Sequence, residues 1–571
     1  MPAFAQTDEL PRVARADIEV VPSNRSLRNA IRRNLNQYRD SLRAVELTPV
    51  PSRLALGERQ RILQLMETRG YYQAEVIYRL REEEDGTERL QYRVDTNEQY
   101  TVLSVSIEGH EFTPPSRWPV AAEGSDLVAD RILSDQSELS NLIDAASCFF
   151  RLSVNHEVQM VDADLGGHVI YRVSADDPST IGTISFEGDL EDIEESFLLR
   201  QTGLRSGACF NRSAVDQAIL NLYQTQLFAS VRRTLQRQAD GSVDIAFQLI
   251  KRPPRTLTSG IGWDTDQGLG LRLGWEHRNL AGRAQRLRLG TELREQRRSV
   301  SADLTLPGFL ERRNTLNWSN TLAYETPSGA EYYLGESRAI ISRQASTNDT
   351  YSFGLAYRRS DERVGDDWNT FSQFRFPLAY DHDQLPGALN PRKGLRYNAK
   401  VEPVVSLIGS NDPYWISNLG WSSFRPLGDQ LILANRLAWT AVWPLTEDSD
   451  LATIPASDRL LAGGGGSVRG YPFRSIGFGP NNFGGTQQWE GSLELRSRFA
   501  EDWGGVIFTD VGSVSGSWNP FSEEQDYLIG VGVGVRYYTR VAPVRFDVAF
   551  PLQPRENDSL FQIYISLGQS F

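Results

Sequence analysis

The chain has 571 residues, which is too long for one ordinary hydrophobic core and predicts about two to four domains. Its formal net charge of −13 argues against a surface that binds nucleic-acid phosphates. The mean hydropathy is −0.41 and no run of about 18 apolar residues occurs, so no transmembrane helix is predicted. A transmembrane β-barrel is still compatible with this composition, because its strands alternate lipid-facing with lumen-facing residues.

Residues 1–14 are interpreted as an N-terminal tail or the remnant of a signal peptide. Ala3-Phe4-Ala5 resembles the small-x-small end of such a signal, with the apolar segment missing or lying upstream. Further along the chain, Cys148 and Cys209 permit one disulfide in an oxidising compartment. Two separate buried thiols fit the sequence equally well.

The clearest local unit lies just before residue 253. A strand at 181–188 is followed by helices at 193–203 and 210–231 and by a hairpin at 231–250. The order β-α-α-β-β therefore fills roughly 75 residues.

The same order recurs twice upstream, so we predict three small α+β domains. In the second copy, prolines interrupt the first helix and make it hard to recognise. Small α/β domains in tandem usually bind or position other molecules. The three predicted domains are 15–98, 99–178 and 179–253.

The pattern changes after residue 253, and short alternating strands follow one another to Phe571. Three examples are "GLGLRLGW" at 268–275, "IGVGVGVRYY" at 529–538 and "FQIYISLGQSF" at 561–571. Each has one apolar face with an aromatic residue near its end, and the other face is small or polar, as in a membrane barrel. Residues 254–571 are predicted to form an all-β barrel of about 16 antiparallel strands. A soluble sandwich is the alternative.

No enzyme site is predicted. The five histidines are scattered, the tetraglycine at 463–466 lacks the Lys-Ser/Thr of a phosphate loop, and Asp381 and Asp383 are interpreted as solvated. We therefore expect no catalysis, no metal, no cofactor and no nucleotide.

The segment "GGGGSVRGYPFRSIGFGP" at 463–480 raises the question of why a pliable glycine run carries a single arginine. If this loop folds back into the barrel, Arg469 needs a carboxylate in a desolvated lumen. Strand parity nominates Glu494, Phe508 and Asp510 as inward-facing partners. An inward Phe beside an inward Asp breaks the binary pattern, as at a site that receives another segment.

These motifs resemble those of the outer-membrane assembly and translocation superfamily. Val468-Arg469-Gly470-Tyr471 is similar to the motif of its sixth extracellular loop, Phe508-x-Asp510-x-Gly512 to the partner motif, and 543–552 with Arg545 and Asp547 to a late strand motif. The β-α-α-β-β units resemble polypeptide-transport-associated (POTRA) domains. Three of them before a barrel most resemble the TamA branch of that superfamily.

The resemblance implies a bacterial outer-membrane protein with periplasmic N-terminal domains. Arg469 would pin the loop inside the barrel, either as a stabiliser or as a functional element. The expected partners are unfolded outer-membrane clients such as autotransporters, outer-membrane lipid, and an inner-membrane-anchored TamB-like protein that docks on the POTRA domains.

The expected mechanism is insertion of clients at the seam between the first and last barrel strands, near 256–264 and 561–571. An open seam exposes strand edges that pair with an incoming strand. Gly568 and Gln569 are expected to weaken this seam, because Gln569 would lie on the apolar face that ends in Phe571. The alternatives are a passive secretion pore or two-partner-type transporter that conducts through the lumen, and a soluble periplasmic binding protein.

Overall fold

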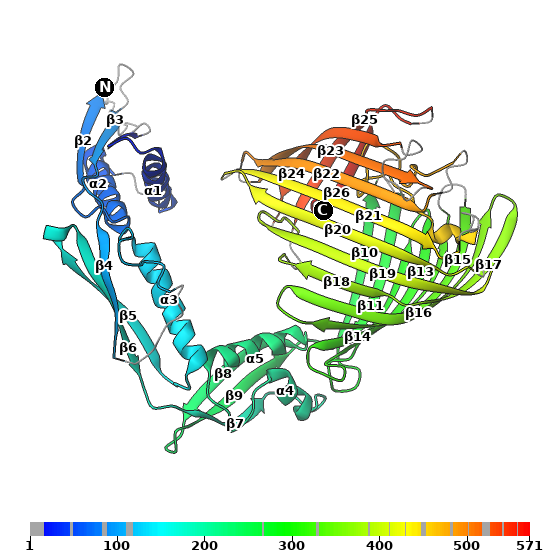
Figure 1. Ribbon diagram of the computed structural model, residues 1–571, viewed down its shortest axis with the longest axis horizontal. Coiled ribbons are helices and arrows are strands. Elements are labelled where there is room, and N and C mark those ends of the chain that lie inside the picture. Colours follow the sequence, from blue (N-terminus) through cyan, green and yellow to red (C-terminus); the bar gives the residue numbers. More distant parts are fainter. Residues whose placement is uncertain are drawn as a thin grey trace, which may run out of the picture. The chain divides into compact units, whose positions relative to one another are not determined.

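The fold is given by a computed structural model (Figure 1). The predicted tail at 1–14 lies outside the described residues. None of the described helices is both long and apolar enough to cross a membrane. The structure describes residues 16–45, 49–82, 88–109, 118–264, 268–326, 330–385, 389–409, 412–428, 430–446, 453–479, 484–500, 502–516, 526–539, 542–556 and 558–571.

The chain divides into two compact units. The first unit contains the first two α/β domains and part of the third, and the second contains the rest of the third domain together with the barrel. The first unit comprises 1–185, 204–217 and 233–246, and the second comprises 186–203, 218–232 and 247–571.

The first domain has the order β-α-α-β-β. Its sheet has the strand order β1-β3-β2, with β1 parallel to β3. Asn24 caps α1 through its side-chain oxygen, which accepts a hydrogen bond from the amide of Leu27. The elements are β1 (Asp17–Val21), α1 (Arg25–Ala44), α2 (Pro51–Thr68), β2 (Glu75–Glu82) and β3 (Glu88–Asp95).

The second domain departs from that order, because a single α-helix, α3, appears among its described residues. The carboxylate of Asp135 on α3 is buried and accepts hydrogen bonds from the amides of Val120 and Ala121 at 2.8 and 2.7 Å. Residues 118–128 thus pack against α3 without forming an α-helix. The elements are β4 (Thr101–Glu108), α3 (Ala129–Ala146), β5 (Leu152–Val161), η1 (Asp162–Asp164) and β6 (Gly166–Ala175), in the sheet order β4-β6-β5.

The third domain again has two helices between its first and second strands. Helix α4 ends at Gly203, whose φ of 70° is left-handed and therefore suits glycine. The sheet order is β7-β9-β8. The elements are β7 (Thr180–Glu187), α4 (Glu195–Thr202), α5 (Arg212–Gln224), β8 (Phe228–Arg237) and β9 (Ser242–Lys251).

Within the second unit, the segment before α4 is attached to the turn that follows β11. Asn279 donates to the carbonyl of Asp192 at 2.6 Å, and Arg283 pairs with Glu194 at 2.7 Å. Lys251 binds the Asp192 carboxylate at 2.5 Å. This hydrogen bond lowers the pKa of Asp192 and raises the pKa of Lys251. We call these five residues the latch.

The barrel is one antiparallel sheet that runs from β10 to β26 (Figure 1). Its strands are β10 (Arg255–Asp264), β11 (Gly268–His277), β12 (Arg286–Leu293), β13 (Arg297–Pro307), β14 (Asn314–Glu325), β15 (Ala330–Gln344), β16 (Asp349–Val364), β17 (Asp367–Arg375), β18 (Leu378–Asp383), β19 (Gly394–Ile408), β20 (Tyr414–Pro426), β21 (Leu431–Pro444), β22 (Gln487–Arg498), β23 (Trp503–Ser515), β24 (Leu528–Tyr538), β25 (Pro543–Pro551) and β26 (Gln562–Leu567).

Seventeen strands make sixteen positions in the wall, because β17 and β18 are two halves of one strand. Both halves pair with β16 on one side and with β19 on the other. The break falls at Phe376 and Pro377, where proline has no amide hydrogen for the ladder. The predicted fold class, α/β domains followed by a barrel of about 16 strands, is confirmed.

The two faces of the strands follow the predicted parity. On β23 and β24, Ile507 and Val533 are exposed on the outer face, whereas Asp510 and Arg536 are buried inside. The exposed apolar side chains form the surface that a lipid bilayer covers in a transmembrane barrel.

The sheet has two edge strands. Its order begins at β10 and ends at β26, and no ladder joins these two strands within the described residues. On its other side, β26 pairs with β25 over the six positions from Val544 to Ala549. The last strand is therefore short and held from one side.

Candidate functional site

The connection between β21 and β22, residues 445–486, turns back into the barrel. We call it the plug loop, and the structure describes 445–446, 453–479 and 484–486 of it. Val468, Arg469 and Tyr471 are each at most 1% exposed. The predicted inward fold of this loop is therefore what the structure contains.

The glycine run lets the loop backbone reach two arginines on the barrel wall. Gly463 and Gly464 have φ values of 106° and 102°, which favour glycine. The carbonyl of Gly465 accepts from Arg545 at 3.2 Å, and the carbonyl of Gly466 accepts from Arg436 at 3.2 Å. With no side chains in between, peptide carbonyls solvate these guanidinium groups.

Arg469 makes a bidentate pair with Asp510 on β23. Its Nε and Nη2 donate to the two carboxylate oxygens at 2.7 and 2.9 Å, and its backbone amide donates to Oδ2 at 3.1 Å. Its Nη1 lies 2.7 Å from Glu494 Oε1 and 3.2 Å from Asp547 Oδ2. One guanidinium thus contacts carboxylates on β22, β23 and β25.

Phe508 supplies the floor of this site. The Arg469 Cζ atom lies 3.4 Å from the centre of the Phe508 ring, so the planar cation stacks on the aromatic face. The structure therefore brings Arg469 together with Glu494, Phe508 and Asp510, the three side chains that strand parity nominates.

Arg469 belongs to a cluster of buried charges. Besides Arg469, two further buried arginines take part: Arg496 pairs with Glu494 at 2.8 Å, and Arg536 pairs with Asp547. Three guanidinium groups thus face three carboxylates, those of Glu494, Asp510 and Asp547. Removing one member of such a network leaves an uncompensated charge, which costs about 3–5 kcal/mol. We call these six residues the lock.

Glycines on neighbouring strands make room for the plug loop. A methyl group at Gly530 on β24 would lie 1.8 Å from the carbonyl oxygen of Arg469. A methyl group at Gly512 on β23 would lie 2.3 Å from a methyl carbon of Val468. Of the alternating glycines in 529–538, Gly530 lies beneath the loop backbone, whereas Gly532 and Gly534 leave room for the side chains of Phe508 and Asp547. The sequence analysis missed this role.

Two hydroxyl groups fix the residues after Arg469. The amide of Gly470 donates to the Tyr564 hydroxyl on β26 at 3.1 Å. The Tyr471 hydroxyl lies within hydrogen-bond distance of the carbonyls of Ile529 and Gln553, at 3.3 and 3.2 Å. The Val-Arg-Gly-Tyr motif therefore contacts the wall at every residue.

A second anchor holds the plug loop on other strands. Asp458, in the short helix η3 (Ala456–Asp458), accepts hydrogen bonds from Arg358 on β16 at 2.9 Å and from Tyr414 on β20 at 2.5 Å. It also pairs with Arg375 on β17. Nothing in the sequence analysis singled out Asp458, because its partners lie 44 to 100 positions away.

The residues after β26 differ from the prediction. Gly568 adopts a φ of 94°, and beyond it Gln569 and Phe571 lie against the lumen wall instead of continuing the apolar face. Gln569 accepts from Arg536 at 3.0 Å, and the Phe571 ring lies 5.1 Å from Arg496 Cζ. The turn at Gly568 changes the parity, which strand alternation cannot anticipate.

The late strand motif contributes both of its polar residues. Asp547 belongs to the lock, and Arg545 donates to Ser566 on β26 as well as to the plug loop. Arg545 therefore connects β26 with the glycine run.

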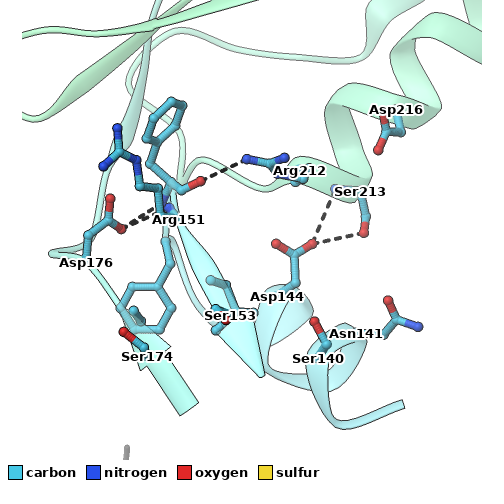
Figure 2. Close-up of a pocket in the computed structure, with 14 residues that line it drawn as sticks. Ser140, Asn141, Asp144, Arg151, Ser153, Ser174, Asp176, Arg212, Ser213 and Asp216 are labelled. Carbon is cyan, nitrogen blue, oxygen red and sulfur yellow. Dashed lines mark hydrogen bonds between the residues drawn. The ribbon is translucent and has the colours of Figure 1, made fainter. Parts of the chain in front are cut away.

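The two cysteines form a disulfide. Cys148 follows α3 and Cys209 precedes α5, and their Cα atoms lie 5.1 Å apart. Beside this crosslink, Asp144 accepts from the hydroxyl of Ser213 at 2.9 Å, and Arg212 donates to the carbonyl of Phe150 at 3.1 Å (Figure 2). The second domain and the start of α5 are thus joined covalently and by hydrogen bonds.

A polar cavity of about 630 Å³ opens at this junction (Figure 2). Its acidic groups already have partners: Asp176 accepts from the backbone amides of Phe150 and Arg151, both at 3.1 Å. The described residues contain no group of three or more His, Cys, Asp or Glu side chains that could hold a metal ion.

Comparisons with known proteins agree with this architecture. A sequence profile of the Omp85 superfamily domain matches residues 279–571, which is more than half of the chain. The chain is 22% identical over 395 residues to the outer membrane protein assembly factor BamA of Neisseria meningitidis serogroup B (strain ATCC BAA-335 / MC58). That match covers 58% of this chain and 48% of the relative, so the chain spans about half the relative's length.

Solved structures were compared with the fold as well. BamA from Haemophilus ducreyi lacking POTRA domains 1–3 matches with a TM-score of 0.58 and 17% identity, covering 98% of this chain and 99% of that one. CdiB from Acinetobacter baumannii matches with a TM-score of 0.47 and 15% identity, covering 82% of this chain and 90% of that one. The first match shows that the fold, α/β domains followed by a β-barrel, is shared.

Proposed function

The chain belongs to the Omp85 superfamily, and from this premise we propose that it is a non-enzymatic factor that inserts or translocates client proteins at the outer membrane. The barrel lies in the outer membrane and the N-terminal domains lie in the periplasm. The clients are unfolded outer-membrane proteins.

The proposed route is lateral, through the seam between β10 and β26. A sheet that ends in two edge strands offers unpaired amides and carbonyls, and an incoming strand can satisfy them by adding to the edge. The client then folds against the wall without leaving backbone groups unsatisfied in lipid. The observation that carries this proposal is the order of the sheet, which starts at β10 and stops at β26.

The finer assignment is to the TamA branch, with autotransporters among the clients and a TamB-like inner-membrane partner on the POTRA domains. It is supported by the three small sheets that precede the barrel strands, in the orders β1-β3-β2, β4-β6-β5 and β7-β9-β8.

A lumen-conducting pore is the competing function, and the plug loop argues against it. The loop is pinned at Asp458 and at Arg469, on different strands of the wall. A pore needs a closed wall and a free lumen, whereas an insertase needs a separable seam and tolerates an occupied lumen.

The test is a disulfide across the seam. Cysteines are placed pairwise at 258–262 and 562–566, and client assembly is measured before and after reduction. The Cys148→Ser/Cys209→Ser background is required, because the reductant would also cleave the native disulfide. Oxidation should stop assembly and reduction should restore it.

The matched control is a crosslink between strands that are already paired. Val548 and Ile563 face each other in the β25–β26 ladder, so a disulfide between Val548→Cys and Ile563→Cys leaves the seam free. This control should assemble clients in both redox states. Normal assembly by the seam-locked barrel would contradict lateral opening and would favour conduction through the lumen.

A further inference from the structure

The C-terminal residues of the chain leave the barrel wall and enter the lock. The amide of Gly568 donates to the carbonyl of Pro543 at 2.7 Å, and its left-handed φ redirects the chain. Gln569 Oε1 then accepts from Arg536 Nε at 3.0 Å, and Ser570 Oγ donates to Glu494 Oε1 at 2.6 Å. Two neighbouring tail residues thus contact two different members of the lock.

These contacts close a ring. Glu494 Oε1, which accepts from Ser570, also lies 2.7 Å from Arg469 Nη1. The same Arg469 nitrogen lies 3.2 Å from Asp547, which pairs with Arg536. From Ser570 the ring runs through Glu494, Arg469, Asp547 and Arg536 back to Gln569. It therefore joins the end of the last strand to the arginine of the plug loop through two buried carboxylates.

Glu494 Oε1 contacts both Ser570 and Arg469, so the attachment of the C-terminal residues and the attachment of the plug loop depend on each other. A buried carboxylate is stabilised by each donor that it accepts, and a buried network loses more than a pairwise sum when one donor leaves. If β26 moves outward, Ser570 leaves Glu494 and Gln569 leaves Arg536. Glu494 and Asp547, the two carboxylates beside Arg469 Nη1, are then less firmly positioned.

We infer that Gln569 and Ser570 are positioning residues that couple the place of β26 to the hold on the plug loop. The inference rests on the proposed function, because seam opening is the movement that displaces β26. Departure of the last strand loosens the loop, and a loosened loop in turn weakens the hold on the tail, since coupling between two sites is reciprocal.

The test measures loop mobility directly. Gly466 is the reporter position, because it is exposed, has no left-handed φ and would place a methyl group in open space. A nitroxide is attached to Gly466→Cys in the Cys148→Ser/Cys209→Ser background of the full chain. The electron paramagnetic resonance spectrum of the label is recorded in the absence of client. The chain with native Gln569 and Ser570 is compared with the double variant Gln569→Ala/Ser570→Ala. The mobile fraction should rise at least about tenfold, because two hydrogen bonds to charged groups are lost.

Two control variants separate coupling from general loosening. Ser570→Thr keeps a hydroxyl and should keep the label immobile, and Gln562→Ala shortens a polar side chain on the same strand, outside the ring, with no change expected. Each variant is first shown to migrate as a folded barrel on an unheated gel. An unchanged spectrum in the double variant, or equal mobility in Gln562→Ala, would overturn the inference.

The two proposals fail separately. Loop mobility is measured without client, so a tail variant that frees the loop supports the coupling even if the seam-locked barrel still assembles clients. Conversely, a seam lock that stops assembly supports lateral opening, and an immobile loop in the tail variant then overturns the coupling alone.

Discussion

At Gly530 the backbone of β24 and the backbone of the plug loop are in direct contact, with no room for a side chain between them. The Arg469 carbonyl passes so close that any Cβ would overlap it at 1.8 Å. The neighbour is backbone, which cannot rotate away as the end of a side chain can. Arg469 can therefore pair with Asp510 only because β24 has no side chain at position 530.

The substitution Gly530→Ala should lift the loop and weaken the lock. Overpacking a tight site costs about 1–3 kcal/mol, and here part of the cost appears as a displaced loop. The measurement is the temperature at which the barrel unfolds on a gel, together with protease cleavage within the plug loop. The matched control is Gly260→Ala on β10, where a methyl group meets nothing within 4 Å. Equal behaviour of the two variants would contradict the close approach.

Individual residues differ in how far the sequence reveals them. Glu494, Phe508 and Asp510 can be found because parity needs only the apolar positions of their own strands. Asp458 and Ser570 cannot, since one lies in a short helix within a loop and the other follows a turn. No periodicity applies to either, and their partners come from distant strands.

At the scale of elements, the plug loop is held at two places by two separate charge clusters. Arg469 binds strands β22, β23 and β25, and Asp458 binds β16, β17 and β20. Two anchors restrict the loop more than one, because a single anchor leaves the remaining segment free to swing.

Asp458→Asn should therefore free the first half of the loop while Arg469 still holds the second. The variant removes one of the two carboxylates beside the buried Arg375, while Glu402 still lies 3.1 Å from it. We therefore expect the free energy of unfolding to fall by about 3 kcal/mol. Urea unfolding and protease cleavage within 453–462 measure the effect. The control Glu311→Gln removes an exposed partner of Arg343 and should cost under about 1 kcal/mol. Intact 453–462 in Asp458→Asn would argue against the second anchor.

At the scale of the whole molecule, the latch attaches the last α/β domain to the barrel, and its charges predict a pH window. The lowered pKa of Asp192 gives stability that is present above its unfolded value of about 3.9 and is lost as pH falls through the folded value. The raised pKa of Lys251 gives stability that is present below about 10.4 and is lost as pH rises through the folded value. The latch should hold between these limits.

Hydrogen exchange of the peptide at 278–285 tests the window. Protection, corrected for intrinsic exchange, should be level between the two limits and fall about twofold to fivefold outside them, as for an exposed ion pair. Lys251→Gln should show, at every pH, the reduced protection that the unsubstituted protein shows only outside the two limits. A flat profile in the unsubstituted protein would rule out the latch as a titrating contact.

The architecture as a whole was largely predictable, because it rests on repetition. Three α/β units and sixteen wall positions each repeat a period that a single sequence displays. What could not be predicted are the exceptions: the non-helical segment held by Asp135 and the inward tail after Gly568. Each depends on one local contact or turn instead of a period.

The disulfide beside α3 has a consequence for the maturation of the chain. With Cys148 and Cys209 as its only cysteines, the protein has a single intrachain connectivity. Its oxidative folding needs an oxidant but no isomerase, because no wrong pairing within one chain exists to be reshuffled. The joint between the second domain and α5 is therefore completed in one oxidation step, in the oxidising compartment.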